Sequence, residues 1–146
     1  MASVTLSALH SRIKTRVETV SGFKQSLRPI RPDFDPATLA DKRFAIELET
    51  ANTGLLRDKE SSYARLEQRV TVRFLRRLSP KQQVSKYTDS LDDEVAIIRA
   101  LTAQTGAWQY DLRVSFETSS REGLQGGEWL LVTMLFSIIH DLALTA

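Results

Sequence analysis

The stretch Glu128–Ile139, EWLLVTMLFSII, constrains the fold more than any other part of this sequence. Read as a β-strand, it is apolar on both faces, because alternate residues point to opposite sides and most of them are large and hydrophobic. Its β-branched and aromatic residues favour a strand over a helix. One face can pack on the core of a small domain, and the other needs a further cover. The residues of that second face are Trp129, Leu131, Thr133, Leu135 and Ile139.

Two covers for the second face are open on physical grounds. The first is a neighbouring copy of the chain, since exposed apolar patches commonly mark interfaces. The second is the chain's own Pro-rich segment 28–39, in which Phe34 and Leu39 are apolar. The first alternative makes three of these residues candidate interface residues, namely Trp129, Leu131 and Leu135.

Two stretches have the periodicity of amphipathic helices. The first begins at a capping hydroxyl, Ser3 or Thr5, and ends at Gly22, which can take a left-handed conformation. The second begins at Ser79-Pro80 and runs to about Thr105. The predicted sheet-facing residues are Leu6, Leu9, Ile13, Val17 and Val20 in the first helix, and Val84, Tyr87, Leu91, Val95, Ile98 and Leu101 in the second.

Three further stretches alternate between apolar and polar residues, as half-buried strands do. They cover residues 42–50, 63–78 and 108–118, and we expect loops over 51–62 and 119–127 and a short tail after 139. The prolines of segment 23–39 leave room only for a short edge strand and one helical turn. The predicted inward residues are Phe44, Ile46, Leu48, Leu66, Val70, Val72, Phe74, Trp108, Tyr110, Leu112, Val114 and Phe116, with Ala45 outward.

The element order α-β-β-α-β-β predicts an α+β fold. Two amphipathic helices can cover one face of a four-stranded, mostly antiparallel sheet. A chain of 146 residues can bury a core of its own, so residues 1–146 are expected to form a single domain.

Charge is distributed unevenly along the chain. Residues 57–86 carry nine basic and three acidic side chains, a net charge of +6, whereas residues 87–146 carry three basic and nine acidic ones, a net charge of −6. Opposite charges of this kind can set the register between copies of the chain. The candidate contact residues of the basic segment are Arg57, Lys59, Arg69, Arg73, Arg76 and Arg77.

The same basic segment supports a second class of function, a basic nucleic-acid-binding module. Lysine and arginine side chains can neutralise phosphates without reading sequence. Exposed aromatic residues on which bases could stack are missing from the predicted outer faces, so this alternative is the weaker one.

No arrangement of residues indicates catalysis. The chain has no cysteine, and its two histidines, His10 and His140, lie far apart in the sequence, whereas metal sites use short, fixed spacings. Asp92, Asp93 and Glu94 are adjacent on a predicted helix, where neighbouring side chains point apart. No glycine-rich loop precedes a helix to hold phosphate. We therefore expect no enzyme, metal site, cofactor or small-molecule ligand.

The sequence also bears on location. The first 17 residues lack the apolar core and cleavage site of a signal peptide. The longest apolar run is shorter than the ~20 residues that a membrane helix needs. The absence of cysteine fits a reducing compartment. We expect a cytoplasmic protein without membrane contact.

The layout as a whole resembles the tail terminator proteins of long-tailed bacteriophages, also called tail-completion or minor tail proteins. The similar features cover nearly the whole chain and consist of layout, without a diagnostic motif. They are the helix LSALHSRIKTRVETV, the Pro-rich RPIRPDFDP, the strands RFAIELETANTG and YARLEQRVTVRFLRRL, the helix VSKYTDSLDDEVAIIRALTAQTG, and the closing pair WQYDLRVSFET and WLLVTMLFSII.

The resemblance implies a structural virion protein with no catalytic residue. Proteins of that family form a ring, commonly a hexamer, at the head-proximal end of the tail tube, where the ring stops tube polymerisation and presents a surface to the head connector. The implied partners are other copies of the chain, the tail tube protein and the connector or stopper protein, with transient passage of DNA. The implied location is the virion tail, assembled in the cytoplasm of the bacterial host. The nearest alternatives are another neck protein, either adaptor or stopper, and a tail tube subunit.

Overall fold

Strand β6 (Trp129–Ala143) is the strand to which the rest of the sheet is attached. It pairs antiparallel with β4 (Tyr63–Arg77) along one edge and with β5 (Leu112–Leu124) along the other. The short strand β1 (Ser3–Val4) pairs in parallel with Asp141 and Leu142, at the C-terminal end of β6. Strand β3 (Arg43–Asn52) lies beyond β4, and β2 (Lys24–Gln25) lies beyond β3. The order is therefore β1-β6-β4-β3-β2, with β5 also on β6.

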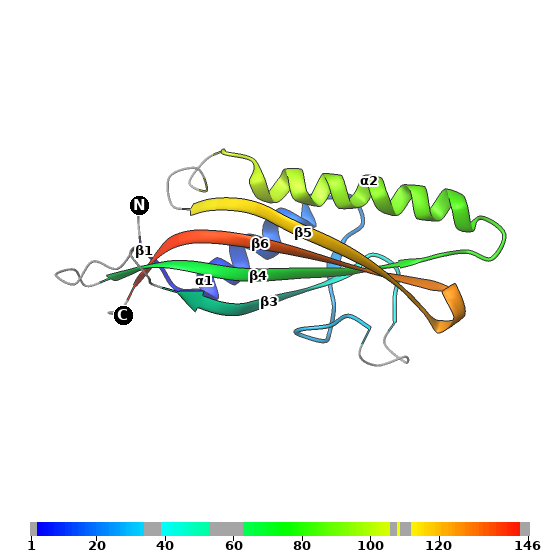
Figure 1. Cartoon of the computed structure of the whole chain (residues 1–146), viewed down its shortest axis with the longest axis horizontal. Coiled ribbons are helices and arrows are strands. Elements are labelled where there is room, and N and C mark those ends of the chain that lie inside the picture. The colour runs from blue at the N-terminus through cyan, green and yellow to red at the C-terminus, as the bar shows by residue number, and fades with distance from the viewer. Residues whose placement is uncertain (1–2, 34–38, 53–62, 106–107, 109–111, 144–146) are drawn as a thin grey trace.

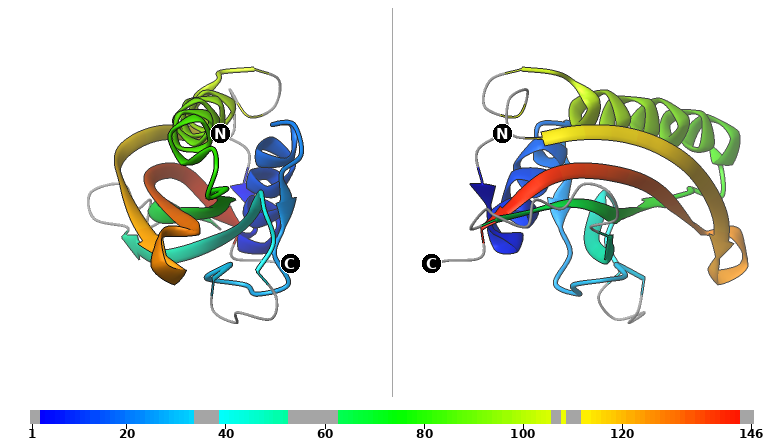
Figure 2. Two further views of the ribbon diagram at one scale, coloured as in Figure 1. Left: turned by 90° about the vertical axis from the view of Figure 1, so that its right-hand side faces the viewer. Right: turned by 60° about the vertical axis from the view of Figure 1, so that its left-hand side comes forward.

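The structure is a computed structural model and describes residues 3–33, 39–52, 63–105, 108 and 112–143. Helices α1 (Leu6–Glu18) and α2 (Gln83–Thr102) lie on the same face of the curved sheet (Figures 1 and 2). Neither helix in the described part of the chain is long and apolar enough to cross a membrane.

The core lies between the two helices and the concave face of the sheet. Alternating residues of β3, β4 and β6 fill it, as the sequence predicts, whereas on β5 only Leu112 is buried and Phe116, predicted to face inward, is 38% exposed. The buried core residues include Leu9, Ile13 and Val17 of α1, Ile97 and Leu101 of α2, Phe44 and Ile46 of β3, Val70, Val72 and Phe74 of β4, Leu112 of β5, and Leu130, Val132, Met134, Phe136 and Ile138 of β6. The α+β class, the two helices and the mostly antiparallel sheet are thereby confirmed.

The sheet is larger than the predicted four strands, because two-residue strands are added at its margins. Thr5 caps α1 and accepts a hydrogen bond from the Ala8 amide at 3.2 Å, so the residues before it are extended and pair with β6 as β1. Helix α1 ends at Glu18, earlier than predicted, and Gly22, with φ +82°, turns the chain into β2.

The hairpin of β5 and β6 is also longer than predicted. Residues 119–124, expected to form a loop, continue β5, and residues 140–143, expected to form a tail, continue β6. The polar residues of β5 remain in a strand because the apolar β6 pairs with them up to Leu124 and Trp129. A β-bulge between Phe116 and Thr118 absorbs one residue, and the turn is reduced to Gln125–Gly127.

Helix α2 differs from the prediction in its start and in its rotation. It begins at Gln83 instead of Ser79-Pro80, and its buried residues are Ser90, Glu94, Ile97 and Leu101. Two of these are polar, which hid the buried stripe in the sequence. Most of the predicted apolar stripe is turned away from the sheet, and only Leu101 of that set is fully buried.

The second face of the sheet is covered in part by the chain itself. The guanidinium of Arg73 donates a hydrogen bond to the carbonyl of Ile30 at 3.2 Å, so the segment before Asp33 crosses this face. Several side chains of this face are buried, namely Ala45, Thr71, Leu75, Leu131 and Ser137. Ala45 thus points away from the helices as predicted, although it is fully covered. Phe34 and residues 35–38, proposed as a cover and as a helical turn, lie outside the described residues.

Candidate assembly surface on helix α2

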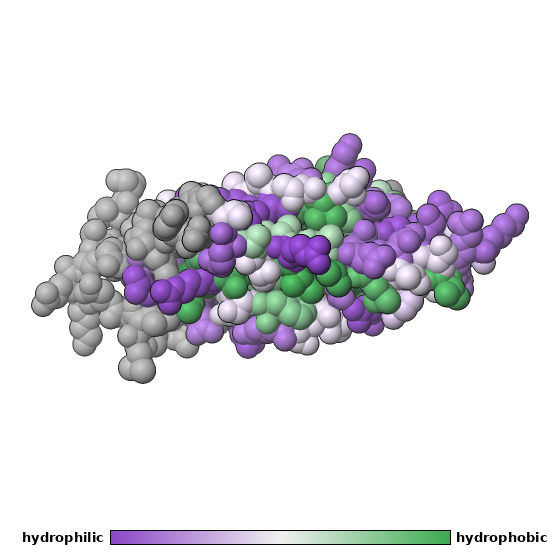
Figure 3. All heavy atoms as spheres, turned by 90° about the horizontal axis from the view of Figure 1, so that it is seen from above, coloured by the Kyte–Doolittle hydropathy of each residue, from purple (hydrophilic) through white to green (hydrophobic). Residues whose placement is uncertain are grey.

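Helix α2 presents an apolar stripe to solvent. Its members recur three and four positions apart, a spacing that places them on one side of a helix. Val84 is 80% exposed, Val95 51% and Tyr87 40%, whereas Leu91 and Ile98 are half-buried. Figure 3 looks onto the molecule from the α2 side and shows hydrophobic residues gathered on this face. We call these five residues the α2 stripe.

Ion pairs to the sheet set the rotation of α2 about its own axis. Glu94, buried on the inner side of the helix, pairs with Arg121 near the end of β5. Asp93, one position earlier, pairs with the buried Arg76 of β4, which also contacts Asp41 at 3.2 Å. Charged groups that leave water need such partners. These pairs fix the side of α2 that carries Glu94, Ile97 and Leu101 toward the sheet, so most of the α2 stripe faces away from it.

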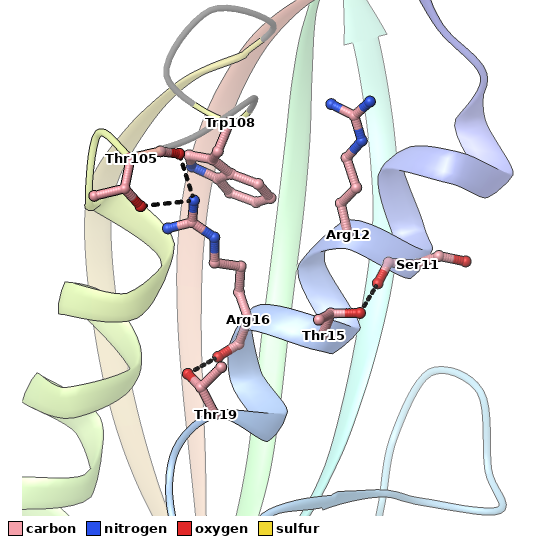
Figure 4. A pocket seen from close by; sticks show the side chains of 7 residues that line it. All are labelled: Ser11, Arg12, Thr15, Arg16, Thr19, Thr105 and Trp108. Carbon is pink, nitrogen blue, oxygen red and sulfur yellow. Dashed lines mark hydrogen bonds between the residues drawn. The ribbon is translucent and has the colours of Figure 1, made fainter.

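The C-terminal end of α2 is held by Arg16 of α1 (Figure 4). Its guanidinium donates hydrogen bonds to the carbonyls of Ala100 at 3.0 Å and Ala103 at 3.1 Å. It also donates to the carbonyl of Thr105 at 3.1 Å, the contact drawn in Figure 4. The last carbonyls of a helix have no partner within it, and a positive charge there also complements the helix dipole. The guanidinium lies 4.5 Å from the ring centroid of Trp108, whose indole N–H donates to the carbonyl of Leu101 at 3.0 Å. The α2 stripe therefore sits on a helix that is fixed along its length.

The open groove beside Arg16, of about 480 Å³, does not have the features of a ligand site. Its arginine hydrogen bonds go to main-chain carbonyls, and Thr15 and Thr19 donate their hydroxyls to the backbone of α1 at 3.0 Å and 2.6 Å. Ligand sites have polar groups that converge on the cavity. In this groove Arg16 instead joins α1 to the end of α2, and the two threonine hydroxyls are used within α1.

The basic residues predicted as contacts are largely paired within the chain. Arg73 contacts Glu47 at 2.7 Å and Arg69 contacts Glu117 at 3.3 Å. Arg76 is buried and forms ion pairs with Asp41 and Asp93. Its prediction as a surface contact residue is therefore wrong. Arg77 is exposed beside it. The other two predicted contacts, Arg57 and Lys59, lie outside the described residues.

The three apolar candidates on β6 also differ in how far they are buried. Leu131 is buried against the chain's own side chains, because Leu75 pairs with it across the strands and is buried too. It is therefore a core residue in this fold instead of a contact residue. Trp129 and Leu135 are half-buried and keep part of their surface in solvent.

His140 is the one buried histidine of the described chain. Both ring nitrogens lack a hydrogen-bond partner, and burial lowers its pKa below the ordinary 6.5, although the nearby Asp141 acts in the opposite direction. Among the described residues, no three histidine, aspartate or glutamate side chains are grouped to hold a metal ion.

No protein-family model matches the sequence, and a comparison with characterised proteins finds no significant match. What the chain can bind is therefore inferred from the arrangement of its described residues. A fixed helix with an uncovered apolar stripe can bind another protein surface. Sequence reasoning found the residues of the stripe but placed them in the core, and it missed Arg16, for which the only signal is a basic residue in the last turn of α1.

Proposed function

We propose that this chain is a structural virion protein that assembles into a ring, expected to be a hexamer, at the head-proximal end of a phage tail tube. In this role it ends tube polymerisation and presents the surface to which the head connector or stopper attaches. The resemblance in layout suggests the setting, and the α2 stripe is the observation that carries an assembly function. A small domain that keeps Val84 and Val95 largely exposed on a fixed helix has an uncovered contact surface.

The rival classes differ in how they use this surface. A neck adaptor, a stopper or a tail tube subunit would also assemble through it, and only the position in the particle separates them from a terminator. A nucleic-acid-binding module would use the basic segment instead. This reading is disfavoured because Arg69, Arg73 and Arg76 already contact carboxylates of the same chain, which reduces the charge available for phosphates.

The test of the proposal is a double variant, Val84→Asp with Val95→Asp. Both side chains are exposed, so the domain should keep its unfolding midpoint while the assembly detected by sedimentation velocity is lost. Tail tubes polymerised with this variant should exceed the length reached with the wild-type chain. Gln104→Asp, an exposed position just after α2, is the matched control. A wild-type chain that stays monomeric even with tail tubes, and that leaves their length unchanged, would refute the proposal.

A further inference from the structure

Strand β5 forms one margin of the sheet and has an open edge (Figure 1). It pairs with β6 on its inner side, and no other strand of the described residues lies along its outer side. In an antiparallel strand, alternate residues turn their backbone N–H and C=O groups outward, so this edge is a row of donors and acceptors without a strand partner. The ligand that fits such a row is another β-strand.

The sequence of β5 around Ser115 is complementary to itself when two copies run antiparallel. With Ser115 opposite Ser115, Arg113 of each copy lies opposite Glu117 of the other. In the same register Val114 lies opposite Phe116. Opposite charges and apolar pairs that face each other across two strands are stabilising. A register centred on Arg113 or on Glu117 instead brings like charges together, so charge selects the register centred on Ser115.

Both charged groups of this register remain available in the single chain. Arg113 is exposed and forms no ion pair or hydrogen bond with the described residues. Glu117 accepts from Arg69 through one carboxylate oxygen, Oε2, at 3.3 Å, and both side chains are partly exposed. Its other oxygen can accept from Arg113 of a second copy. The β-bulge that follows Phe116 interrupts regular pairing, so the contact is confined to residues near 113–117.

The α2 stripe lies on the flank of α2 that is nearest this edge. Helix α2 packs between α1 and β5 (Figure 2). Asp93 binds β4, and Val95, two positions later, projects in nearly the opposite direction, because successive helical residues turn by about 100°. On β5, Phe116 is 38% exposed and packs edge-on against Phe136, with 5.6 Å between the ring centroids. The open edge and the exposed apolar side chains thus occupy the same margin of the molecule.

We propose that a second copy of this chain pairs with β5 in the antiparallel register centred on Ser115. One continuous sheet then passes through both copies, and the α2 stripes meet over the joined strands, where each covers the other. The remaining outward charges of α2 sum to zero, so they do not oppose this approach; they are Lys86, Asp89, Asp92 and Arg99. The contact uses the same surface on both copies and is complete with two.

This pair goes beyond the proposed ring and regulates it. Because the pair covers the α2 stripe of both copies, it must open before the stripe can contact neighbours in a ring. The pair is therefore the form of the chain away from a tail tube, and it keeps free copies from assembling elsewhere. This regulatory step rests on the proposed function, whereas the pair itself does not.

The test is a disulfide cross-link at the two-fold axis, which is selective because the chain contains no cysteine. Residues directly opposite each other in antiparallel strands have Cα atoms about 4.5–5.5 Å apart, a separation that a disulfide spans. Ser115→Cys should therefore give a cross-linked dimer under mild oxidation, measured by non-reducing electrophoresis. Ser120→Cys is the matched control, because it is also exposed on β5 but its two copies would lie about 30 Å apart.

A charge reversal tests the register by a second measurement. Arg113→Glu should raise the dissociation constant of the dimer roughly tenfold in sedimentation experiments, since two favourable cross-strand pairs become unfavourable. Arg77→Glu makes the same change at another exposed position and should leave the constant unchanged. Equal cross-linking of Ser115→Cys and Ser120→Cys, or an unchanged constant in Arg113→Glu, would overturn the β5 contact. Matching unfolding midpoints establish that each variant is folded.

The cross-linked dimer also separates this inference from the proposed function. Oxidised Ser115→Cys should fail to limit the length of tail tubes and should limit it again after reduction. If the oxidised dimer limits tube length as well as the reduced chain does, the pair does not withhold the α2 stripe. If Ser115→Cys cross-links but leaves tube length unchanged in both states, the ring proposal fails and the pair stands. A wild-type chain that is monomeric without tubes yet limits their length would overturn the pair and leave the ring.

Discussion

Arg16 and Trp108 stack on each other at the point where α1 meets the end of α2, with the guanidinium 4.5 Å from the indole ring centroid. Arg16 at the same time donates to the main-chain carbonyls that α2 leaves unpaired, and Trp108 donates to the carbonyl of Leu101. The stack therefore connects the N-terminal helix, the C-terminal end of α2 and the segment that leads into β5.

Arg16→Gln is expected to lower the free energy of unfolding by about 1.5–3 kcal/mol, the range for hydrogen bonds to a charged group. The reason is that several main-chain carbonyls lose their donor together. Urea denaturation of both proteins measures the difference. Lys14→Gln is the matched control, because Lys14 is partly exposed and forms an ion pair with Glu18 on the same helix at 3.7 Å. Its effect should stay within about 0.5 kcal/mol. Equal effects of the two substitutions would show that the Arg16 contacts contribute nothing specific.

Arg76→Ala is expected to destabilise the fold severely, by about 3–5 kcal/mol, because it leaves Asp93 without its buried partner. The neighbouring Arg77→Ala removes the same charge from an exposed position and should change the free energy of unfolding by about 0.5 kcal/mol or less. Thermal unfolding of the two variants separates them directly. If both melt like the wild type, Arg76 does not hold α2 on the sheet.

The difference between Arg76 and Arg77 also shows what could be read from the sequence. Every second residue of β6 from Leu130 to Ile138 faces the core and is buried, and this is the face that was predicted to pack on the core. A run of arginines carries no such signal, because burial of one of them depends on a carboxylate that arrives from another element. The same limit applies to α2, where Glu94 is inside only because Arg121 of β5 meets it.

The end of β5 was missed for a related reason. Residues 119–124, SSREGL, have the composition of a loop and lack alternation. They form a strand because β6 continues beside them as a ready partner, which is a long-range property of the sheet. The exposed position of the α2 stripe was likewise invisible. Its spacing is that of a core-facing stripe, and only the partners of Glu94 and Asp93 decide which side of the helix faces inward.

His140 is expected to make the fold sensitive to mild acid. Burial lowers its pKa in the folded chain below the ordinary 6.5, so the unfolded chain takes up a proton at a higher pH than the folded chain does. The free energy of unfolding therefore has its full value above about pH 6.5. As the pH decreases from there toward the lowered pKa, this free energy falls by up to about 1.4 kcal/mol per pH unit. Urea midpoints measured between pH 7.5 and about pH 5 report the loss.

His140→Leu should remove this loss, because an uncharged side chain on the core side of β6 has no proton to gain. Met134→Leu is the control for a core substitution without a titrating group, and it should retain the acid sensitivity of the wild type. A His140→Leu protein that loses stability between pH 6.5 and 5 as steeply as the wild type would assign the effect to other groups.

Substitutions on the second face of β6 are expected to separate effects on folding from effects on binding. Leu131 is buried, so Leu131→Glu places a charge in the interior and should prevent folding. Trp129 and Leu135 are half-buried, so Trp129→Glu and Leu135→Glu should leave a cooperative thermal transition while they weaken binding to the chain's partners in the particle. Co-pelleting with tail tubes measures that binding, and near-ultraviolet circular dichroism establishes the fold. Loss of the folded signal in all three variants would place this whole face in the core and leave the α2 stripe as the candidate contact surface.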